Sequence, residues 1–237
     1  MDMKRRANVP KNDLARAYIA YSLFVAILAI FLAVALLLSS TVAGCEWRGS
    51  LSAYYHGSDF QRNVFVGTLC AVAAFLLLYR GWRDTEARLL SVAGAAAVLV
   101  AFFPTSVETY ECVAGGSTEK LDLSSGWIHG IAAAILFLCI LIVGVVLPSI
   151  RNRKLEKRKK LPLHWYWSSA AMMIAGLICA VLGSVAFEGS VLFLLGEALL
   201  VVGFGWFWLL RSLHLGRIEP LSYLLTEADS LAVKDAL

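Results

Sequence analysis

Six long apolar stretches, separated by short charged segments, run through the 237 residues of the chain. A helix needs about 20 apolar residues to cross the hydrocarbon core of a bilayer. Five of the stretches contain no Asp, Glu, Lys or Arg, and the sixth contains only Glu197. The predicted spans are Ala17–Cys45, Asn63–Tyr79, Leu89–Val107, Leu123–Ile150, Leu161–Phe187 and Ser190–Leu210. We therefore predict an all-α integral membrane protein with six transmembrane helices.

The composition supports this class and excludes others. The chain is 59% hydrophobic and 16% charged, whereas a soluble domain is about 45–50% apolar and about 25% charged. These values argue against a soluble enzyme, a disordered chain and a nucleic-acid-binding domain. The expected partner is the lipid bilayer.

The basic residues predict the orientation of the spans. Eighteen of the 21 Lys and Arg residues fall in four segments that six spans would place on one side of the membrane, namely 1–16, 80–88, 151–160 and 211–237. Basic loops stay in the cytoplasm. We therefore expect a cytoplasmic N-terminal segment (1–16), a six-helix domain (17–210) and a cytoplasmic tail (211–237), in a bacterial inner membrane.

The cysteines divide into two groups. Three of them, Cys70, Cys139 and Cys179, fall inside spans, where a thiol packs as a small apolar group. Cys45 and Cys112 fall in or beside the outer loops, where an oxidising compartment favours a disulfide between them. Two free thiols, or lipidation of Cys45 after cleavage at a lipobox-like sequence, are the alternatives.

Small residues recur along the last two spans. The fifth span contains Gly176, Ala180 and Gly183, and the sixth contains Gly196 and Gly203. In lipid, small side chains allow two helices to approach closely. The short connection between the two spans predicts that they form an antiparallel hairpin.

Glu197 is the most unusual residue of the spans. A carboxylate inside a membrane is costly and normally faces a partner or a water-filled cavity. Its position predicts a depth of about 10 Å below the outer end of the sixth span, at 1.5 Å per residue. His129, near the outer end of the fourth span, is the candidate partner.

A second polar group precedes the second span. Ser52, His56 and Asp59 would share one face of a continuous helix because they are spaced four and three residues apart. Gly57 weakens a helix at that point.

Three interpretations of these polar residues remain open. The first is a buried structural cluster. The second is a ligand or proton site made of His56, Asp59, His129 and Glu197. The third is a catalytic metal site, with zinc held by His56, Asp59 and His129, since imidazole and carboxylate groups are suitable zinc ligands.

Four runs, Ser50–Gly67, Ala93–Ser106, Gly126–Phe137 and Gly196–Ser212, occur in order along the chain. Together they resemble a family of small bacterial six-span membrane proteins of unknown function. The family pattern has a polar entrance to the second span, a Pro that closes the third, a His early in the fourth and a Glu in the sixth. The resemblance therefore implies a shared polar site, and the matching positions are His56, Asp59, Pro104, His129 and Glu197.

The chain also has a more distant similarity to the transmembrane hydrolases that include the alkaline ceramidases and the adiponectin receptors. That similarity implies a membrane zinc site, to which Ser52, His56, Asp59 and His129 would contribute.

The leading functional expectation is a membrane protein whose outward-facing polar pocket binds a lipid head group, a small ligand or a proton. A metal-dependent lipid amide or ester hydrolase is the first alternative. A transporter or channel subunit that uses Glu197 is the second.

Overall fold

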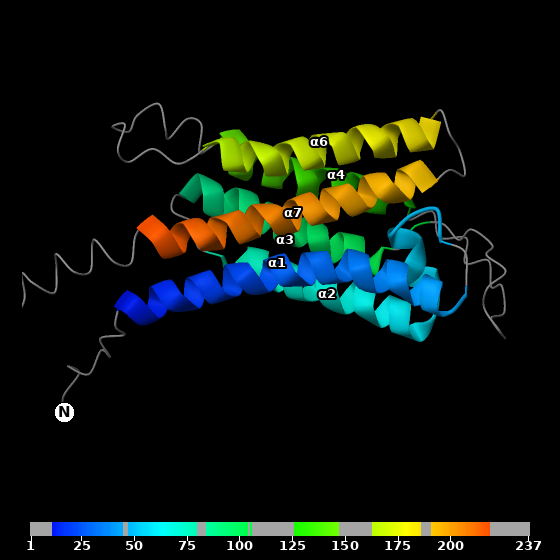
Figure 1. The fold of residues 1–237 in the computed structure, drawn as a ribbon, viewed down its shortest axis with the longest axis horizontal. Helices are drawn as coiled ribbons and strands as arrows, with labels where there is room; N and C mark the ends of the chain where they lie inside the picture. Colours follow the sequence, from blue (N-terminus) through cyan, green and yellow to red (C-terminus); the bar gives the residue numbers. More distant parts are fainter. Residues whose placement is uncertain are drawn as a thin grey trace, which may run out of the picture.

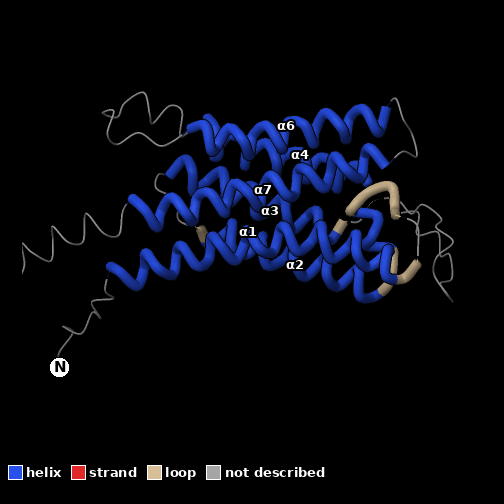
Figure 2. The backbone as a smooth tube through the Cα atoms, in the orientation of Figure 1, coloured by secondary structure: helices blue, strands red, loops and turns tan. Residues whose placement is uncertain are grey.

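The protein is described from a computed structural model, which covers residues 11–44, 47–79, 84–103, 105, 126–146, 163–185 and 191–218. Figure 2 shows helices and connecting loops in these residues and no strand. The helices are α1 (Lys11–Val42), the short 3₁₀ helix η1 (Ser52–His56), α2 (Asp59–Leu78), α3 (Asp84–Phe102), α4 (Gly126–Leu141), its π-helical continuation η2 (Ile142–Val146), α6 (Leu163–Val185) and α7 (Val191–Ile218).

Six of these helices are long and apolar enough to cross a membrane, which confirms the predicted number. Their ends differ from the prediction, most of all at the end of α7, which lies at Ile218 and not at Leu210. The start of α2 lies at Asp59 and not at Asn63. Ser58 caps this end: its hydroxyl accepts the Gln61 N–H (3.3 Å), and the Gln61 side chain accepts the Ser58 N–H (3.1 Å).

Replacing Ser58 with Ala should lower the free energy of unfolding by about 1 kcal/mol, because the Gln61 N–H at the start of α2 loses the hydroxyl that accepts it. Unfolding in mixed detergent micelles measures the change. Ser184→Ala is the matched control, since the Ser184 hydroxyl only bonds the Val181 carbonyl on an exposed face. Equal losses for the two variants would contradict the role given to the cap.

The helices lie side by side in one bundle (Figure 1). Each helix packs on the next in the order α6, α7, α1, α2, α3, α4. The first and last helices of this series are only loosely joined, because α4 contacts α6 and α7 sparsely. The start of α1 and the end of α7 lie at the same end of the bundle, which we call the terminal end. The opposite end, which carries the start of α7, is called the Glu197 end. An even number of crossings produces this arrangement.

The outer surface of the bundle is apolar. Large side chains such as Phe24, Ile131 and Val181 point outward from their helices, while small and medium residues such as Ala97 and Leu36 fill the interior. A soluble monomer rarely exposes so much contiguous apolar surface. With the six long apolar helices, this surface indicates a multi-pass membrane protein.

The contact between α6 and α7 is the most extensive in the bundle, as the small residues predict. A Cβ atom placed on Gly196 would lie 2.5 Å from the Ala180 nitrogen and 2.7 Å from the Gly176 oxygen. A Cβ atom on Gly183 would lie 2.5 Å from the Phe193 nitrogen. The two backbones can approach this closely only because these positions carry no side chain.

Candidate functional site

Glu197 lies in the second turn of α7, about 9 Å along the helix from Val191 at 1.5 Å per residue. Its carboxylate is partly buried and accepts two hydrogen bonds from one segment. The Leu51 N–H donates to Oε2 at 2.5 Å, and the Ser52 hydroxyl donates to Oε1 at 3.4 Å. In the part of the chain that the structure describes, the ion pairs are elsewhere, so Glu197 has no cationic partner there.

The segment that binds Glu197 is residues 47–58, which we call the strap. It connects α1 to α2 and includes η1. Within it, the Ser50 hydroxyl accepts the Ala53 N–H at 2.9 Å and lies 3.0 Å from the Ser52 hydroxyl. Two serine hydroxyls are thus gathered beside the Glu197 carboxylate.

Buried residues anchor the strap to the bundle. The Tyr54 side chain is fully buried and belongs to the same core cluster as Leu36 of α1 and Phe65 of α2. The guanidinium carbon of Arg48 lies 5.9 Å from the centre of the Tyr54 ring. Arg48 also donates to the Ala53 carbonyl at 3.5 Å. The strap is therefore a packed part of the Glu197 end.

The two predicted site histidines both contact the residues that follow α3, which ends at Phe102. His56 Nε2 lies 2.7 Å from the Thr105 carbonyl oxygen, and His129 Nδ1 lies 2.9 Å from the Phe103 carbonyl oxygen. Since a carbonyl only accepts, each of these ring nitrogens carries a proton and donates. Both histidines therefore hold the chain that leaves α3, which is a structural role.

The sequence suggested His129 as the partner of Glu197, but within the described residues the two side chains have other partners. The His129 ring stacks on Phe65 (centroids 6.5 Å apart) and its nitrogen is directed to the Phe103 carbonyl. The carboxylate instead takes its donors from Leu51 and Ser52. A backbone N–H in a loop leaves no trace in the amino-acid pattern, which is why this contact was missed.

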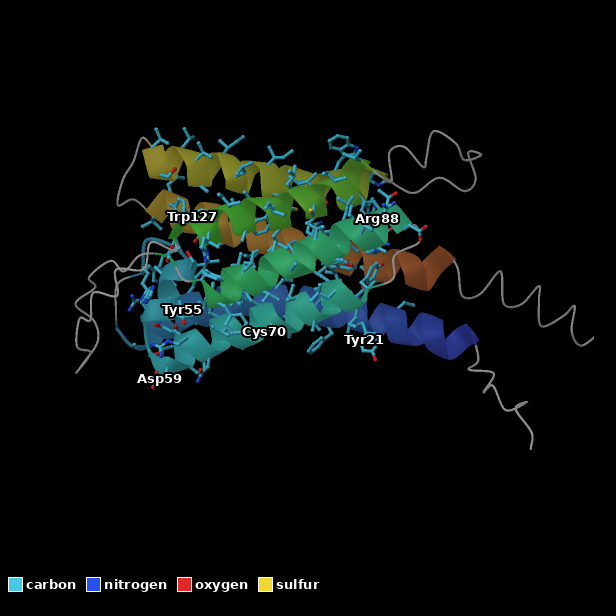
Figure 3. All side chains as sticks on the ribbon, turned by 180° about the vertical axis from the view of Figure 1, so that it is seen from behind. Tyr21, Tyr55, Asp59, Cys70, Arg88 and Trp127 are labelled. Atoms are coloured by element: carbon cyan, nitrogen blue, oxygen red, sulfur yellow. The ribbon has the colours of Figure 1, made fainter. Side chains whose placement is uncertain are left out.

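Asp59 lies apart from the other predicted residues. Its side chain is 93% exposed and lies 3.5 Å from Arg62, one turn further along α2. Figure 3 shows Asp59 near Tyr55 at the Glu197 end, with Arg88 near the opposite end. The helical conformation is interrupted at Gly57, between η1 and α2. Ser52, His56 and Asp59 therefore do not share one continuous helix.

These positions bear on the predicted metal site. Among the described residues there is no group of three or more His, Cys, Asp or Glu side chains that could hold a metal ion. His56, Asp59 and His129 are thus not brought together as zinc ligands, because each is directed to a different partner.

The cysteine predictions are only partly covered. Cys45 and Cys112 lie outside the described residues, so both their disulfide and the lipidation of Cys45 stay predictions. The described cysteines, Cys70, Cys139 and Cys179, are free thiols.

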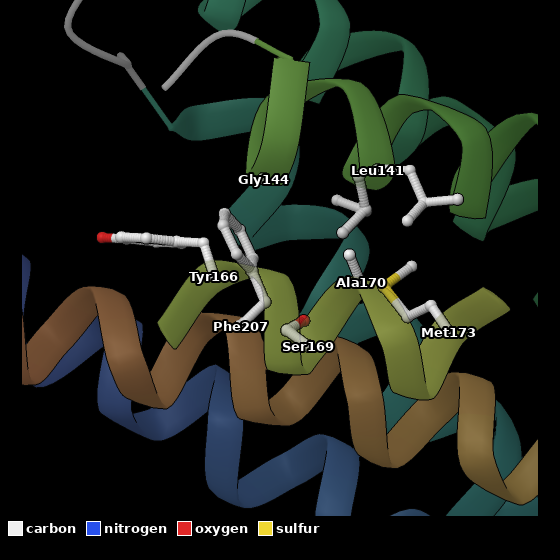
Figure 4. Close-up of a pocket in the computed structure, with 8 residues that line it drawn as sticks. Leu141, Gly144, Tyr166, Ser169, Ala170, Met173 and Phe207 are labelled. Carbon is white, nitrogen blue, oxygen red and sulfur yellow. The ribbon is translucent and has the colours of Figure 1, made fainter. Parts of the chain in front are cut away.

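A separate small hollow, too narrow to hold a water molecule, lies in the terminal half of the bundle, between η2, α6 and α7 (Figure 4). Its lining includes Gly144, Tyr166, Ser169, Met173 and Phe207. The lining residues are largely apolar. The Ser169 hydroxyl is already used, because it donates to the Gly203 carbonyl at 2.8 Å. This hollow is distinct from the Glu197 site, which belongs to the other end.

Comparison of the chain with models of known protein families, with curated proteins and with solved structures finds no match in any of the three. The resemblance to small bacterial six-span proteins and the similarity to transmembrane hydrolases therefore stay predictions.

Proposed function

We propose that the chain lies in a bacterial inner membrane with its terminal end in the cytoplasm and its Glu197 end outside. The distribution of Lys and Arg supports this orientation, because the basic segments connect helices at the terminal end.

We further propose that Glu197 and the strap bind a ligand that presents a hydrogen-bond-donating head group, preferably an ammonium. The source is either a lipid head group or a free small amine, and a proton is the competing occupant. The supporting observation is the Glu197 carboxylate itself, which lies inside a span and has no cationic partner among the described residues. Burying a carboxylate in apolar surroundings is costly unless a cation or a proton neutralises it.

The strap suits this role. The Leu51 N–H and the Ser52 hydroxyl already stabilise the carboxylate, and the Ser50 hydroxyl beside them can accept a hydrogen bond from an ammonium group. A ligand at this position would be held by one charge-assisted bond and by neutral hydroxyl groups.

The test is a binding titration on the protein in phosphatidylcholine nanodiscs, with added phosphatidylethanolamine or free ethanolamine as probes. Phosphatidylcholine has no N–H donor, so it is the reference. Glu197→Gln should weaken binding of the amine by about tenfold or more, because a hydrogen bond to a charged group contributes about 1.5–3 kcal/mol. Asp59→Asn is the matched control at the same end, and it should bind as the wild type does.

The outcomes separate the sources of the ligand. Binding of the lipid alone identifies a head-group site, and binding of ethanolamine alone identifies a small-amine site. Proton uptake that depends on Glu197, with no amine binding, would leave a proton site and remove the amine. Unchanged binding in Glu197→Gln would reject the proposal.

The structure bears differently on the two alternatives, the hydrolase and the transporter. The hydrolase gains no support from the described residues, since its proposed ligands are not gathered. The transporter would need the bundle to open, because buried Leu200 and Phe204 pack between Glu197 and the terminal end of α7.

A further inference from the structure

A second buried carboxylate lies at the terminal end. Glu86, in the first turn of α3, accepts a hydrogen bond and ion pair from Nη2 of Arg211 in α7. Both residues are buried, at 7% and 8% exposure. Apart from this pair, α3 packs mainly on α2 and α4, and α7 mainly on α1 and α6. The pair therefore joins two helices that otherwise make few contacts.

Aromatic rings enclose the Arg211 guanidinium. Its central carbon lies 5.4 Å from the ring centre of Tyr79, 5.7 Å from that of Trp208 and 6.0 Å from that of Phe207. These distances allow cation–π contacts. The pair is thus a defined contact with a fixed geometry.

Several polar atoms beside the pair have no hydrogen-bond partner in the described part of the protein. They are Arg211 Nε, Trp208 Nε1 and Ser22 Oγ, all buried. Ser22 lies at the same level of the bundle as Trp208. Gly205 of α7 packs against Ala26 of α1, and from this contact Ser22 and Trp208 each lie about one turn further towards the terminal end. Buried polar groups without partners destabilise the closed arrangement, and water would satisfy them.

The hollow described above adjoins this cluster. Phe207 lines the hollow and also lies against the Arg211 guanidinium. On the other side of the hollow, α4 continues as the π-helical turn η2, and such turns interrupt the regular packing of a helix. Across this seam α4 itself contacts α6 and α7 only sparsely, and η2 supplies the main contact with α6, so opening the seam at this end means separating η2 from the α6–α7 hairpin.

We infer that the Glu86–Arg211 pair is a gate at the terminal end, and that its opening admits water into the seam between α4 and the α6–α7 hairpin. The closed state is held by the pair and its aromatic enclosure. The open state gains hydration of Arg211, Trp208 and Ser22. The inference concerns the end of the bundle opposite Glu197 and does not depend on the ligand proposed there.

The native thiol of Cys139 reports on this gate. Cys139 is buried in α4, next to Ile140, which lines the hollow. A charged methanethiosulfonate reagent reacts with the thiolate and needs water to reach it. The rate at Cys139 is measured by mass spectrometry of the full chain in nanodiscs. Cys70 in α2 and Cys179 in α6 do not line the hollow, and their rates report general loosening of the bundle.

Glu86→Gln should raise the labelling rate of Cys139 by about tenfold or more, because the ion pair that holds the gate is lost. Arg211→Ala should do the same. The double variant Glu86→Leu/Arg211→Met, which removes both charges together, should raise the rate less than Arg211→Ala does, because it leaves no buried carboxylate without a partner. Arg62→Ala removes an exposed ion pair at the other end and should leave the rate unchanged.

Two results would overturn the gate. One is an unchanged Cys139 rate in Glu86→Gln, the milder variant, which keeps the shape of the side chain. The other is an equal rise at Cys70, Cys139 and Cys179, which would show general loosening of the bundle in place of a local opening.

Discussion

Gly196→Leu is expected to separate α6 from α7 and to lower the free energy of unfolding by about 3 kcal/mol or more. Even a Cβ atom at this position would lie 2.5 Å from the Ala180 nitrogen and 2.7 Å from the Gly176 oxygen. Both are backbone atoms of α6, so no side chain can rotate away, and the helices must move apart. Unfolding in mixed micelles of increasing dodecyl sulfate content measures the loss.

Gly130→Leu is the matched control for this variant. Gly130 lies in α4 on the exposed surface, and a Cβ atom there would meet no atom within 4 Å. Leucine is also a better helix former than glycine. The control should therefore be as stable as the wild type or slightly more stable, and a similar loss in both variants would contradict the proposed close packing of α6 on α7.

Arg211→Ala should lower the free energy of unfolding by about 3–5 kcal/mol, because it leaves the buried Glu86 carboxylate without its partner. Arg62→Ala removes an exposed pair with Asp59 and should cost no more than about 1 kcal/mol. The same unfolding assay compares the two variants.

Replacing both partners gives a sharper test of the same pair. The double variant Glu86→Leu/Arg211→Met removes both charges together, so its stability should return to near that of the wild type. If Arg211→Ala were no more harmful than Arg62→Ala, the Glu86–Arg211 pair would not be the buried contact described above.

The six helices could be predicted because each span is read from one stretch of sequence. Length and the absence of charge are local properties, and a bilayer requires both. The hairpin of α6 and α7 followed for the same reason, since Gly176 and Gly196 permit a close approach whatever surrounds them. The start of α2 was missed although Ser58 and Gln61 have the three-residue spacing of a capping box.

The site was predicted less completely, because it depends on contacts between distant segments. Glu197 was identified correctly as the polar residue of the sixth span, but its partners lie almost 150 residues earlier in the chain. Leu51 contributes only its backbone N–H, which any residue but proline would supply. Nothing in the sequence singles out Glu86 or Arg211, and only the packed bundle shows that they are buried together.

The central claim is that the six helices span a membrane with the Glu197 end on its outer face. Asp59 and Asp84 test it as a matched pair, because they are the exposed first residues of α2 and α3, at opposite ends of the bundle. Each is changed to Cys in a chain whose five native cysteines are replaced, and intact cells are treated with a membrane-impermeant maleimide. The account predicts that Asp59→Cys is labelled in intact cells and Asp84→Cys only after the membrane is permeabilised. The reverse pattern, or equal labelling of both, would contradict it.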